Sequence, residues 1–283
     1  MVIYKGMAGL GNQMFEYACA RALALRNNTE VCVWRAPADC KDGEVKICDS
    51  SSGANPLEPF AIKARDASSQ DLLNIQYRIV EKPFKFYPDL LHAKGNVLLD
   101  GFWQSEQYFT DFRTTIREEL EFKDAGRMRD SRERIAALRQ NTNAAIVAVH
   151  VRRGDYVIAK NSGIFHNLST NWFNTAMARF PANVAFLIFS DDMPWCRATF
   201  TGPRMNYSNG RDALEDLALM RACDGYIISN SSFSWWGAWL SDNPQAPVIA
   251  PSADCWFGPV LQKYSPHDAS HIVPDGWIRQ QDT

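Results

Sequence analysis

Short runs of apolar residues alternate along the chain with longer amphipathic stretches. The short runs predict strands, which we place at residues 2–5, 30–34, 97–100, 145–149, 184–189, 225–228 and 248–250. The longer stretches predict helices, which we place at residues 12–26, 106–121, 124–140, 170–180 and 212–222, with a last one that carries Trp235, Trp236 and Trp239. Ser105, and Ser169 or Thr170, are placed to cap two of these helices.

The two halves of the chain differ in how regular this alternation is. From residue 145 onward strands and helices alternate, and the three clearest strands each end in polar side chains. This order is typical of a doubly wound parallel sheet with a site along its carboxyl edge. The earlier part predicts a smaller and looser α/β domain, so we predict domains 1–143 and 144–283. The charged helix 124–140 between them is expected to present a solvated face.

The composition is that of a globular protein. Of 283 residues 46% are hydrophobic and 22% charged, with a formal net charge of −2, which suggests neither a nucleic-acid-binding nor a polybasic membrane surface. No signal peptide and no apolar membrane span is recognised. Seven cysteines without a CxxC pair favour a reducing cytoplasm. For Cys40 and Cys48 an ordinary loop is favoured over a disulfide or a metal site.

The stretch AIVAVHVRRGDY, residues 145–156, predicts the centre of the second domain. Its strand delivers His150, Arg152, Arg153 and Asp155 to the carboxyl edge of the sheet, with Gly154 supplying a turn. Two adjacent guanidinium groups can each hold a phosphate through two charge-assisted hydrogen bonds. We therefore expect an anion site here, rather than an arginine pair solvated on a loop.

Adjacent carboxylates follow the next strand, where Ser190 precedes Asp191 and Asp192. A carboxylate can accept two N–H donors of guanine, which selects guanine over adenine. Metal binding is the rival interpretation, and capping of the following helix is the structural one. No Asp-x-Asp occurs in the chain and Asp-x-Glu occurs only at 42–44, so the metal signature of many nucleotide-sugar enzymes is missing. Arginine can replace a divalent ion in neutralising a diphosphate leaving group.

The third strand ends in a serine run that includes Asn230, Ser231, Ser232 and Phe233. Hydroxyl and backbone N–H groups at a helix start can bind phosphate. Capping by one of the serines is a complete structural explanation and can coexist with that role. The tryptophans that follow are expected in the core rather than at a sugar.

A glycine-rich turn, residues 6–11, joins the first strand to the first helix and leads into Asn12 and Gln13. A strand, such a turn and a helix start together favour close approach of a phosphate or a sugar to the backbone. The pattern GxxGxG matches neither the dinucleotide fingerprint nor the Walker A loop. A tight turn without a ligand explains it equally well.

Five stretches make the chain resemble glycosyltransferase family 11, the α-1,2-fucosyltransferases in their bacterial form. They are residues 9–15 (GLGNQMF), 101–106 (GFWQSE), 150–156 (HVRRGDY), 189–192 (FSDD) and 228–240. The resemblance implies an α/β, GT-B-like fold of two Rossmann-type domains facing a cleft, with an acceptor-side N-terminal domain and a C-terminal domain that binds GDP-β-L-fucose. It also implies inverting transfer of L-fucose to the 2-hydroxyl of a terminal β-galactose, with no metal and no other cofactor.

The implied partners are GDP-fucose and a galactose-terminated oligosaccharide or lipid-linked glycan of O-antigen or capsule, with no nucleic acid. The enzyme is then cytoplasmic, and peripheral contact with the inner membrane stays open. One alternative is a GDP-sugar transferase of another linkage or acceptor. Another is a non-catalytic GDP-sugar or glycan-binding protein. An oxidoreductase is disfavoured because the dinucleotide fingerprint fails.

Carried over by motif, the resemblance assigns roles to individual residues. Arg152, assisted by Arg153, would hold the β-phosphate and stabilise the charge that develops on it. His150 and Asp191 or Asp192 are expected to contact guanosine, and Ser231, Ser232 and Phe233 the diphosphate and fucose. Asn12 is expected to face donor and acceptor. The donor site is also expected to include Gln13, Ser190 and Asn230.

The base for the galactose hydroxyl stays open between Asp155 and His166. Asp155 is alternatively expected to orient Arg153 or the turn, whereas an imidazole titrates near neutral pH. Glu16 stands where the family usually has Gln, and residues 167–172 depart from the commoner form. That loop is expected near the acceptor, so the acceptor's identity is left open.

Overall fold

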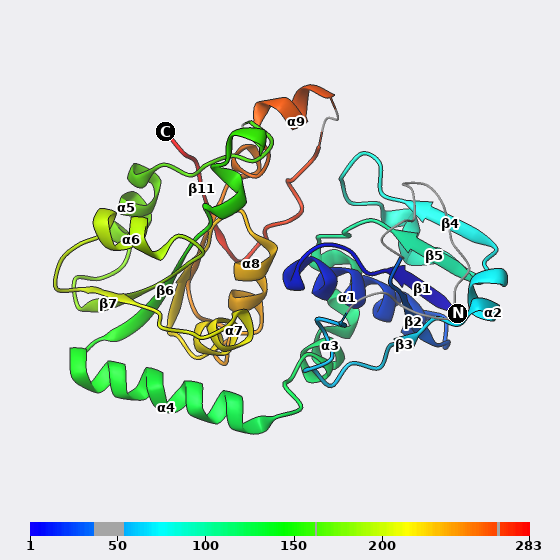
Figure 1. Cartoon of the computed structure of the whole chain (residues 1–283), viewed down its shortest axis with the longest axis horizontal. Helices are drawn as coiled ribbons and strands as arrows, with labels where there is room; N and C mark the ends of the chain where they lie inside the picture. The colour runs from blue at the N-terminus through cyan, green and yellow to red at the C-terminus, as the bar shows by residue number, and fades with distance from the viewer. Residues whose placement is uncertain (37–53, 162, 265–266) are drawn as a thin grey trace. The chain divides into compact units, whose positions relative to one another are not determined.

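The computed structural model describes residues 1–36, 54–161, 163–264 and 267–283. They form two compact units, Met1–Lys123 and Asp124–Thr283 (Figure 1). Each unit has a parallel β-sheet with helices packed against it, which confirms the α/β prediction of two Rossmann-type domains. Cys40 and Cys48 lie outside the described residues.

The first unit holds a five-stranded parallel sheet in the order β3-β2-β1-β5-β4. Its strands are β1 (Val2–Lys5), β2 (Val31–Trp34), β3 (Arg65–Asp66), β4 (Tyr77–Val80) and β5 (Val97–Asp100). Its α-helices are α1 (Leu10–Arg26), α2 (Ser69–Leu73) and α3 (Arg113–Glu119). Strands β3 and β4 were not predicted because they are edge strands with exposed or half-exposed residues, so they lack the continuous apolar run of a central strand.

The predicted helix 106–121 is broken in the structure. Two 3₁₀ turns, Glu106–Tyr108 and Thr110–Phe112, precede α3. Between them the backbone of Phe109 leaves the helical region at φ −132°, while its side chain is fully buried. Burial of this ring therefore overrides continuous helix formation. The predicted cap is confirmed, because the Ser105 hydroxyl accepts a hydrogen bond from the N–H of Gln107.

The second unit holds a six-stranded parallel sheet in the order β11-β10-β9-β6-β7-β8. Its strands are β6 (Ala145–Val151), β7 (Val184–Ser190), β8 (Met205–Tyr207), β9 (Gly225–Ile227), β10 (Val248–Pro251) and β11 (Ile278–Gln280). Its α-helices are α4 (Ala125–Thr142), α5 (Thr170–Ala178), α6 (Met193–Thr199), α7 (Ala213–Arg221), α8 (Ser232–Trp239) and α9 (Pro259–Tyr264). The short edge strands β8 and β11 were not predicted.

Helix α4 belongs to the second unit, so the division falls at 123/124 rather than at the predicted 143/144. It packs against α7 and β6 (Figure 1). Its charges, expected on a solvated face, include ion pairs between Arg132 and Asp242 at 2.7 Å and between Arg139 and Asp224 at 2.8 Å. These pairs join α4 to segments about 85 to 110 residues away, which sequence periodicity does not reveal.

The core of the second unit forms on both faces of its sheet. On one face Val149 of β6 and Ile188 of β7 pack with Trp172 of α5. α5 and α6 lie on this side, and α4 and α7 lie on the other (Figure 1). Trp235 and Trp236 of α8 are fully buried, which confirms that they belong to the core. A rigid two-sided core holds the ends of the central strands in place.

Candidate functional site

The three polar strand ends predicted to form a site come together in the second unit. Strands β9, β6 and β7 are neighbours and run parallel, so their carboxyl ends lie side by side. Arg152 follows β6, Asp191 follows β7 and Ser229 follows β9. Hydrogen bonds described below connect β6 to both neighbours at this edge.

Arg152 lies between two carboxylates. Its Nη1 is 2.8 Å from Oδ2 of Asp191, and its Nη2 is 2.6 Å from Oδ1 of Asp155. The guanidinium carbon is 5.4 Å from the centre of the Tyr156 ring. Asp155 was expected to orient Arg153 or the turn, and the structure pairs it with Arg152 instead. Fixed from two sides and about one-third exposed, this cation is preorganised for an anion.

Arg153 is held by Asp192 and an aromatic ring. Its Nε is 3.1 Å from Oδ2 of Asp192, and its guanidinium carbon lies 3.8 Å from the centre of the Trp195 ring, within the range of a cation–π contact. Oδ1 of Asp192 also accepts from the N–H of Trp195 and caps α6. Ser190 accepts from the Asp192 N–H through its hydroxyl. The capping interpretation of Asp192 is therefore confirmed.

Asp191 fixes the turn that carries both arginines. Its Oδ1 accepts from the N–H groups of Arg153 at 2.9 Å and Gly154 at 3.1 Å. A Cβ at position 154 would lie 2.4 Å from Oδ2 of Asp191, so this close approach requires glycine. Both aspartates thus use their oxygens within the protein. Their contact with guanosine stays a prediction.

His150 is buried beside the third strand end. Its Nδ1 is 2.8 Å from the hydroxyl oxygen of Ser229, and its ring centre is 5.6 Å from that of Phe233. Burial lowers the pKa of His150 from 6.5 to about 4, Asp191 opposes the shift and Arg152 adds to it. The imidazole is therefore neutral at physiological pH.

The serine run has different partners from those that capping alone predicts. Ser231 occupies the N-cap position of α8 without a side-chain capping bond, and Ser232 is the first helical residue. The Asn230 amide donates to the carbonyl oxygens of His166 and Trp256, so it holds two loops in place. The start of α8, with Ser231, Ser232 and the half-buried Phe233, remains suited to an anion.

His166 pairs with Asp282, a partner that the sequence did not predict. Its Nε2 is 2.9 Å from Oδ2 of Asp282, and the same carboxylate accepts from the N–H of Ser169. Burial raises the pKa of Asp282, but hydrogen bonds from Ser169 and His166 outweigh it and lower the pKa overall. Ser169 also caps α5 as predicted. A carboxylate that orients an imidazole is an arrangement used in general base catalysis.

Asn12 and Gln13 lie in the first unit, at the start of α1. The Asn12 side-chain oxygen accepts from the Gln104 amide at 2.9 Å. The Gln13 amide donates to the carbonyl of Ala8 at 3.0 Å, and its side-chain oxygen is buried without a hydrogen-bond partner. Glu16 is fully buried and accepts from the N–H of Met7 at 3.0 Å.

Two further acidic residues were missed. Asp216 of α7 accepts from the Ser208 hydroxyl at 2.5 Å, and burial raises its pKa. Glu81 follows β4, and burial raises its pKa to about 7 although the N–H groups of Trp103 and Phe102 lower it. Asp216 was interpreted only as part of a helix, and Glu81 follows a strand that the pattern did not predict. Raised carboxyl pKa values are enriched at functional sites.

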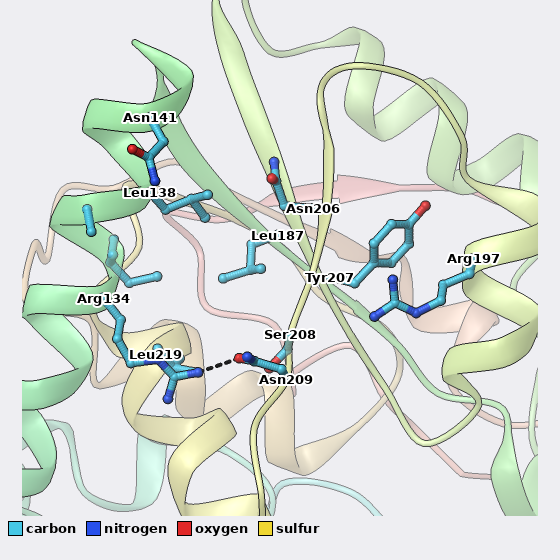
Figure 2. A pocket seen from close by; sticks show the side chains of 12 residues that line it. Arg134, Leu138, Asn141, Leu187, Arg197, Asn206, Tyr207, Ser208, Asn209 and Leu219 are labelled. Atoms are coloured by element: carbon cyan, nitrogen blue, oxygen red, sulfur yellow. Dashed lines mark hydrogen bonds between the residues drawn. The ribbon is translucent and has the colours of Figure 1, made fainter.

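A pocket of about 480 Å³ is lined by residues of α4, β7, β8 and the segment that follows β8 (Figure 2). Its apolar wall includes Leu138, Leu187 and Leu219, and Arg134 hydrogen-bonds Asn209 across its rim. None of the site residues predicted from the sequence lines it. The site residues that the sequence predicts in the second unit lie instead at the carboxyl edge of the sheet.

Within the described residues, no group of three or more His, Cys, Asp or Glu side chains is arranged to hold a metal ion. Among the helices of that part of the chain, none has both the length and the apolar composition needed to cross a membrane.

Several known proteins are similar in sequence to this chain. The chain is 28% identical over 306 residues to the alpha-1,2-colitosyltransferase of Escherichia coli, covering 99% of this chain and 98% of the relative. It is 24% identical to the O-antigen biosynthesis glycosyltransferase WbnK of Escherichia coli, covering 95% and 97%. It is 26% identical to galactoside 2-alpha-L-fucosyltransferase Sec1 of Mus musculus, covering 82% and 62%.

A solved structure supports the fold. The crystal structure of the glycosyl transferase family 9 protein from Veillonella parvula DSM 2008 matches with a TM-score of 0.51 at 10% identity, covering 100% of this chain and 87% of that chain. At this identity the likeness concerns the fold alone. The model of glycosyl transferase family 11 matches residues 5–257, which include all five quoted motifs and strands β2 to β10. The chain therefore belongs to glycosyltransferase family 11.

Proposed function

We propose that this protein transfers L-fucose from GDP-β-L-fucose to the 2-hydroxyl of a terminal β-galactose, with inversion and an α-1,2 linkage. Family membership makes it a glycosyltransferase, and its relatives support a GDP-sugar donor. The names of a bacterial and a mouse relative both specify transfer to a 2-position. That agreement between distant relatives supports the linkage.

The preorganised arginine pair carries the proposal. Cleavage of the fucose–GDP bond builds negative charge on the diphosphate and positive charge on the anomeric carbon. Arg152, held by Asp155 and Asp191, meets the β-phosphate charge without having to reorganise. Arg153 and the start of α8 add positive potential. We propose that these groups replace a divalent ion, so that no metal and no other cofactor is required.

We infer that Asp216 contacts the guanine base. Asp191 and Asp192 each accept two or more hydrogen bonds or ion pairs from the protein. Asp216 is held by Ser208 through one oxygen, so the second can accept an N–H of guanine. Its partly buried position strengthens such a bond.

The structure's contacts favour His166 over Asp155 as the base for the acceptor hydroxyl. Asp155 forms an ion pair with Arg152, so its carboxylate is already engaged within the protein. Nε2 of His166 bonds Asp282, which leaves Nδ1 for a hydroxyl. Replacing His166 by Ala is expected to lower transfer 10²–10⁴-fold, and replacing Asp155 by Asn much less.

The donor sugar has a second candidate. One relative that matches nearly the whole chain is a colitosyltransferase, and colitose differs from fucose by lacking the 3-hydroxyl. The mouse relative names fucose. Both sugars share the configuration at the reacting carbon, so one site geometry accommodates either. Direct competition between the two GDP-sugars decides between them.

The acceptor is proposed to be a galactose-terminated oligosaccharide or lipid-linked glycan. The WbnK relative is named for O-antigen biosynthesis, which supports a bacterial surface glycan. Such a glycan is assembled from cytoplasmic GDP-sugars, so we propose that the protein acts in the cytoplasm.

The test measures GDP release from GDP-fucose and GDP-colitose, with EDTA present, against lactose and Galβ1,3-linked disaccharides. Acceptor-dependent release from GDP-fucose, with an α-1,2 linkage by NMR, is the expected result. Faster release from GDP-colitose would reassign the donor. GDP binding in calorimetry without release from either donor would instead indicate a binding protein. The Arg152→Ala variant controls for contaminating hydrolases.

A further inference from the structure

Tyr156 ends the turn that carries the arginine pair, and the sequence alone predicts no role for it. Its side chain is only 9% exposed. The ring stacks on that of Phe165, with the centres 4.2 Å apart and the planes at 8°. The guanidinium carbon of Arg152 lies 5.4 Å from the centre of the Tyr156 ring, within the range of a cation–π contact. The Tyr156 N–H donates to the Arg153 carbonyl at 2.7 Å, so the backbone fixes the ring to the turn.

The hydroxyl of Tyr156 reaches the segment between β9 and α8. It donates a buried hydrogen bond of 2.9 Å to the carbonyl oxygen of Asn230. Burial raises the pKa of Tyr156 above its usual value of 10, although Arg152 opposes the shift. The hydroxyl therefore keeps its proton and remains a donor at physiological pH. Because the bond is buried, loss of the hydroxyl leaves the carbonyl without a partner in a place that water does not easily reach.

This bond fixes the peptide group that directly precedes α8. The Asn230 carbonyl and the Ser231 N–H belong to one planar peptide group. That N–H donates to the carbonyl of Ser229 at 2.8 Å, so Tyr156 holds one side of the peptide group and the end of β9 holds the other. Ser231 occupies the N-cap position of α8 without a side-chain capping bond. The direction of the first N–H groups of α8 therefore depends on how this peptide group is held.

We propose that Tyr156 is a positioning residue, which holds Arg152 and the start of α8 in register so that both bind the same diphosphate. The inference rests on the proposed function, in which these two groups receive the charge of the GDP leaving group. The Tyr156 ring lies against the guanidinium group, and its hydroxyl fixes the peptide group before α8. One side chain thus sets the spacing between two anion-binding groups that follow different strands.

Two nucleotides that differ by one phosphate test this role. GDP carries the β-phosphate and GMP lacks it, so the ratio of their dissociation constants measures what the β-phosphate contributes to binding. Tyr156→Phe keeps the ring against Phe165 and removes only the hydroxyl. In calorimetry we expect this variant to bind GMP like the natural protein and GDP about 10-fold more weakly. Phosphorus NMR of saturating GDP should show a displaced β-phosphate signal in the same variant.

Tyr226→Phe is the matched control. The Tyr226 hydroxyl is also buried in the second unit and donates to the Ser241 hydroxyl at 2.8 Å. It further contacts the carbonyl groups of Arg221 and Cys223, near the end of α7. Removing it takes a buried hydroxyl from the same unit without touching the arginine turn. We expect its melting temperature to fall like that of Tyr156→Phe, and its ratio of GDP to GMP affinity to stay at the natural value.

The outcomes separate this proposal from the proposed function. An unchanged ratio in Tyr156→Phe, or equal weakening of GDP and GMP, would overturn the positioning role, because the hydroxyl would then serve stability alone. An equal change of the ratio in Tyr226→Phe would overturn it too. A ratio that depends on Tyr156 in a protein that transfers no sugar supports the positioning role and refutes only the transfer. A natural protein that binds GDP no more tightly than GMP would refute both.

Discussion

The buried imidazole of His150 makes the second unit sensitive to acid. It is bonded to Ser229 and packed against Phe233, and burial disfavours its charged form. The experiment lowers the pH from 7 to 4 for both the natural protein and the His150→Gln variant. Gln keeps a polar side chain at this position but cannot titrate.

The expected magnitude follows from the pKa values. Burial lowers the pKa of His150 from 6.5 to about 4, and this difference corresponds to about 3 kcal/mol. Because the folded pKa lies below the unfolded one, the unfolded chain takes up its proton first as the pH falls. The contribution to the unfolding free energy is therefore complete above pH 6.5 and is lost between pH 6.5 and 4.

Urea unfolding at closely spaced pH values measures this loss. Hydrogen exchange of peptides from β6 and α8 assigns it to the second unit. Between pH 6.5 and 4 the natural protein should lose about 3 kcal/mol more than His150→Gln. His92→Gln, at an exposed position, should follow the natural protein. Parallel curves for the natural protein and His150→Gln would refute the reasoning, because His150 would then not be buried in its neutral form.

Other predictions follow from the same contacts. Arg152→Ala should lower fucose transfer about 10²–10³-fold without a change in melting temperature, and full activity would remove its role at the diphosphate. Asp216→Asn should weaken GDP binding about 10- to 100-fold in calorimetry and leave ADP binding unchanged. Burial raises the pKa of Glu81 from 4.5 to about 7, so stability present below pH 4.5 is lost as the pH rises to 7. Glu81→Gln should therefore gain about 3 kcal/mol relative to the natural protein between pH 4.5 and 8, whereas the exposed control Glu118→Gln should not.

Central strands and their polar ends were predictable from the sequence. A strand buried on both faces requires a continuous apolar run, so β1, β6 and β7 stand out directly. Edge strands such as β4 and β8 pair on one side and tolerate polar residues, so the pattern missed them. The order of strands and helices also placed Arg152 and Asp191 at one edge, because parallel strands share their carboxyl end.

The partners of each site residue were decided only by the tertiary structure. The sequence left Asp191 and Asp192 open between guanosine, metal and capping, and the fold pairs both with the arginines. Asp282 joins His166 across 116 positions of the chain, and Gln104 joins Asn12 across 92. Short-range patterns encode burial and backbone preference, because these depend on neighbouring residues. Hydrogen-bond partners and pKa shifts depend on which distant segments pack together, and that is fixed only when the sheets assemble.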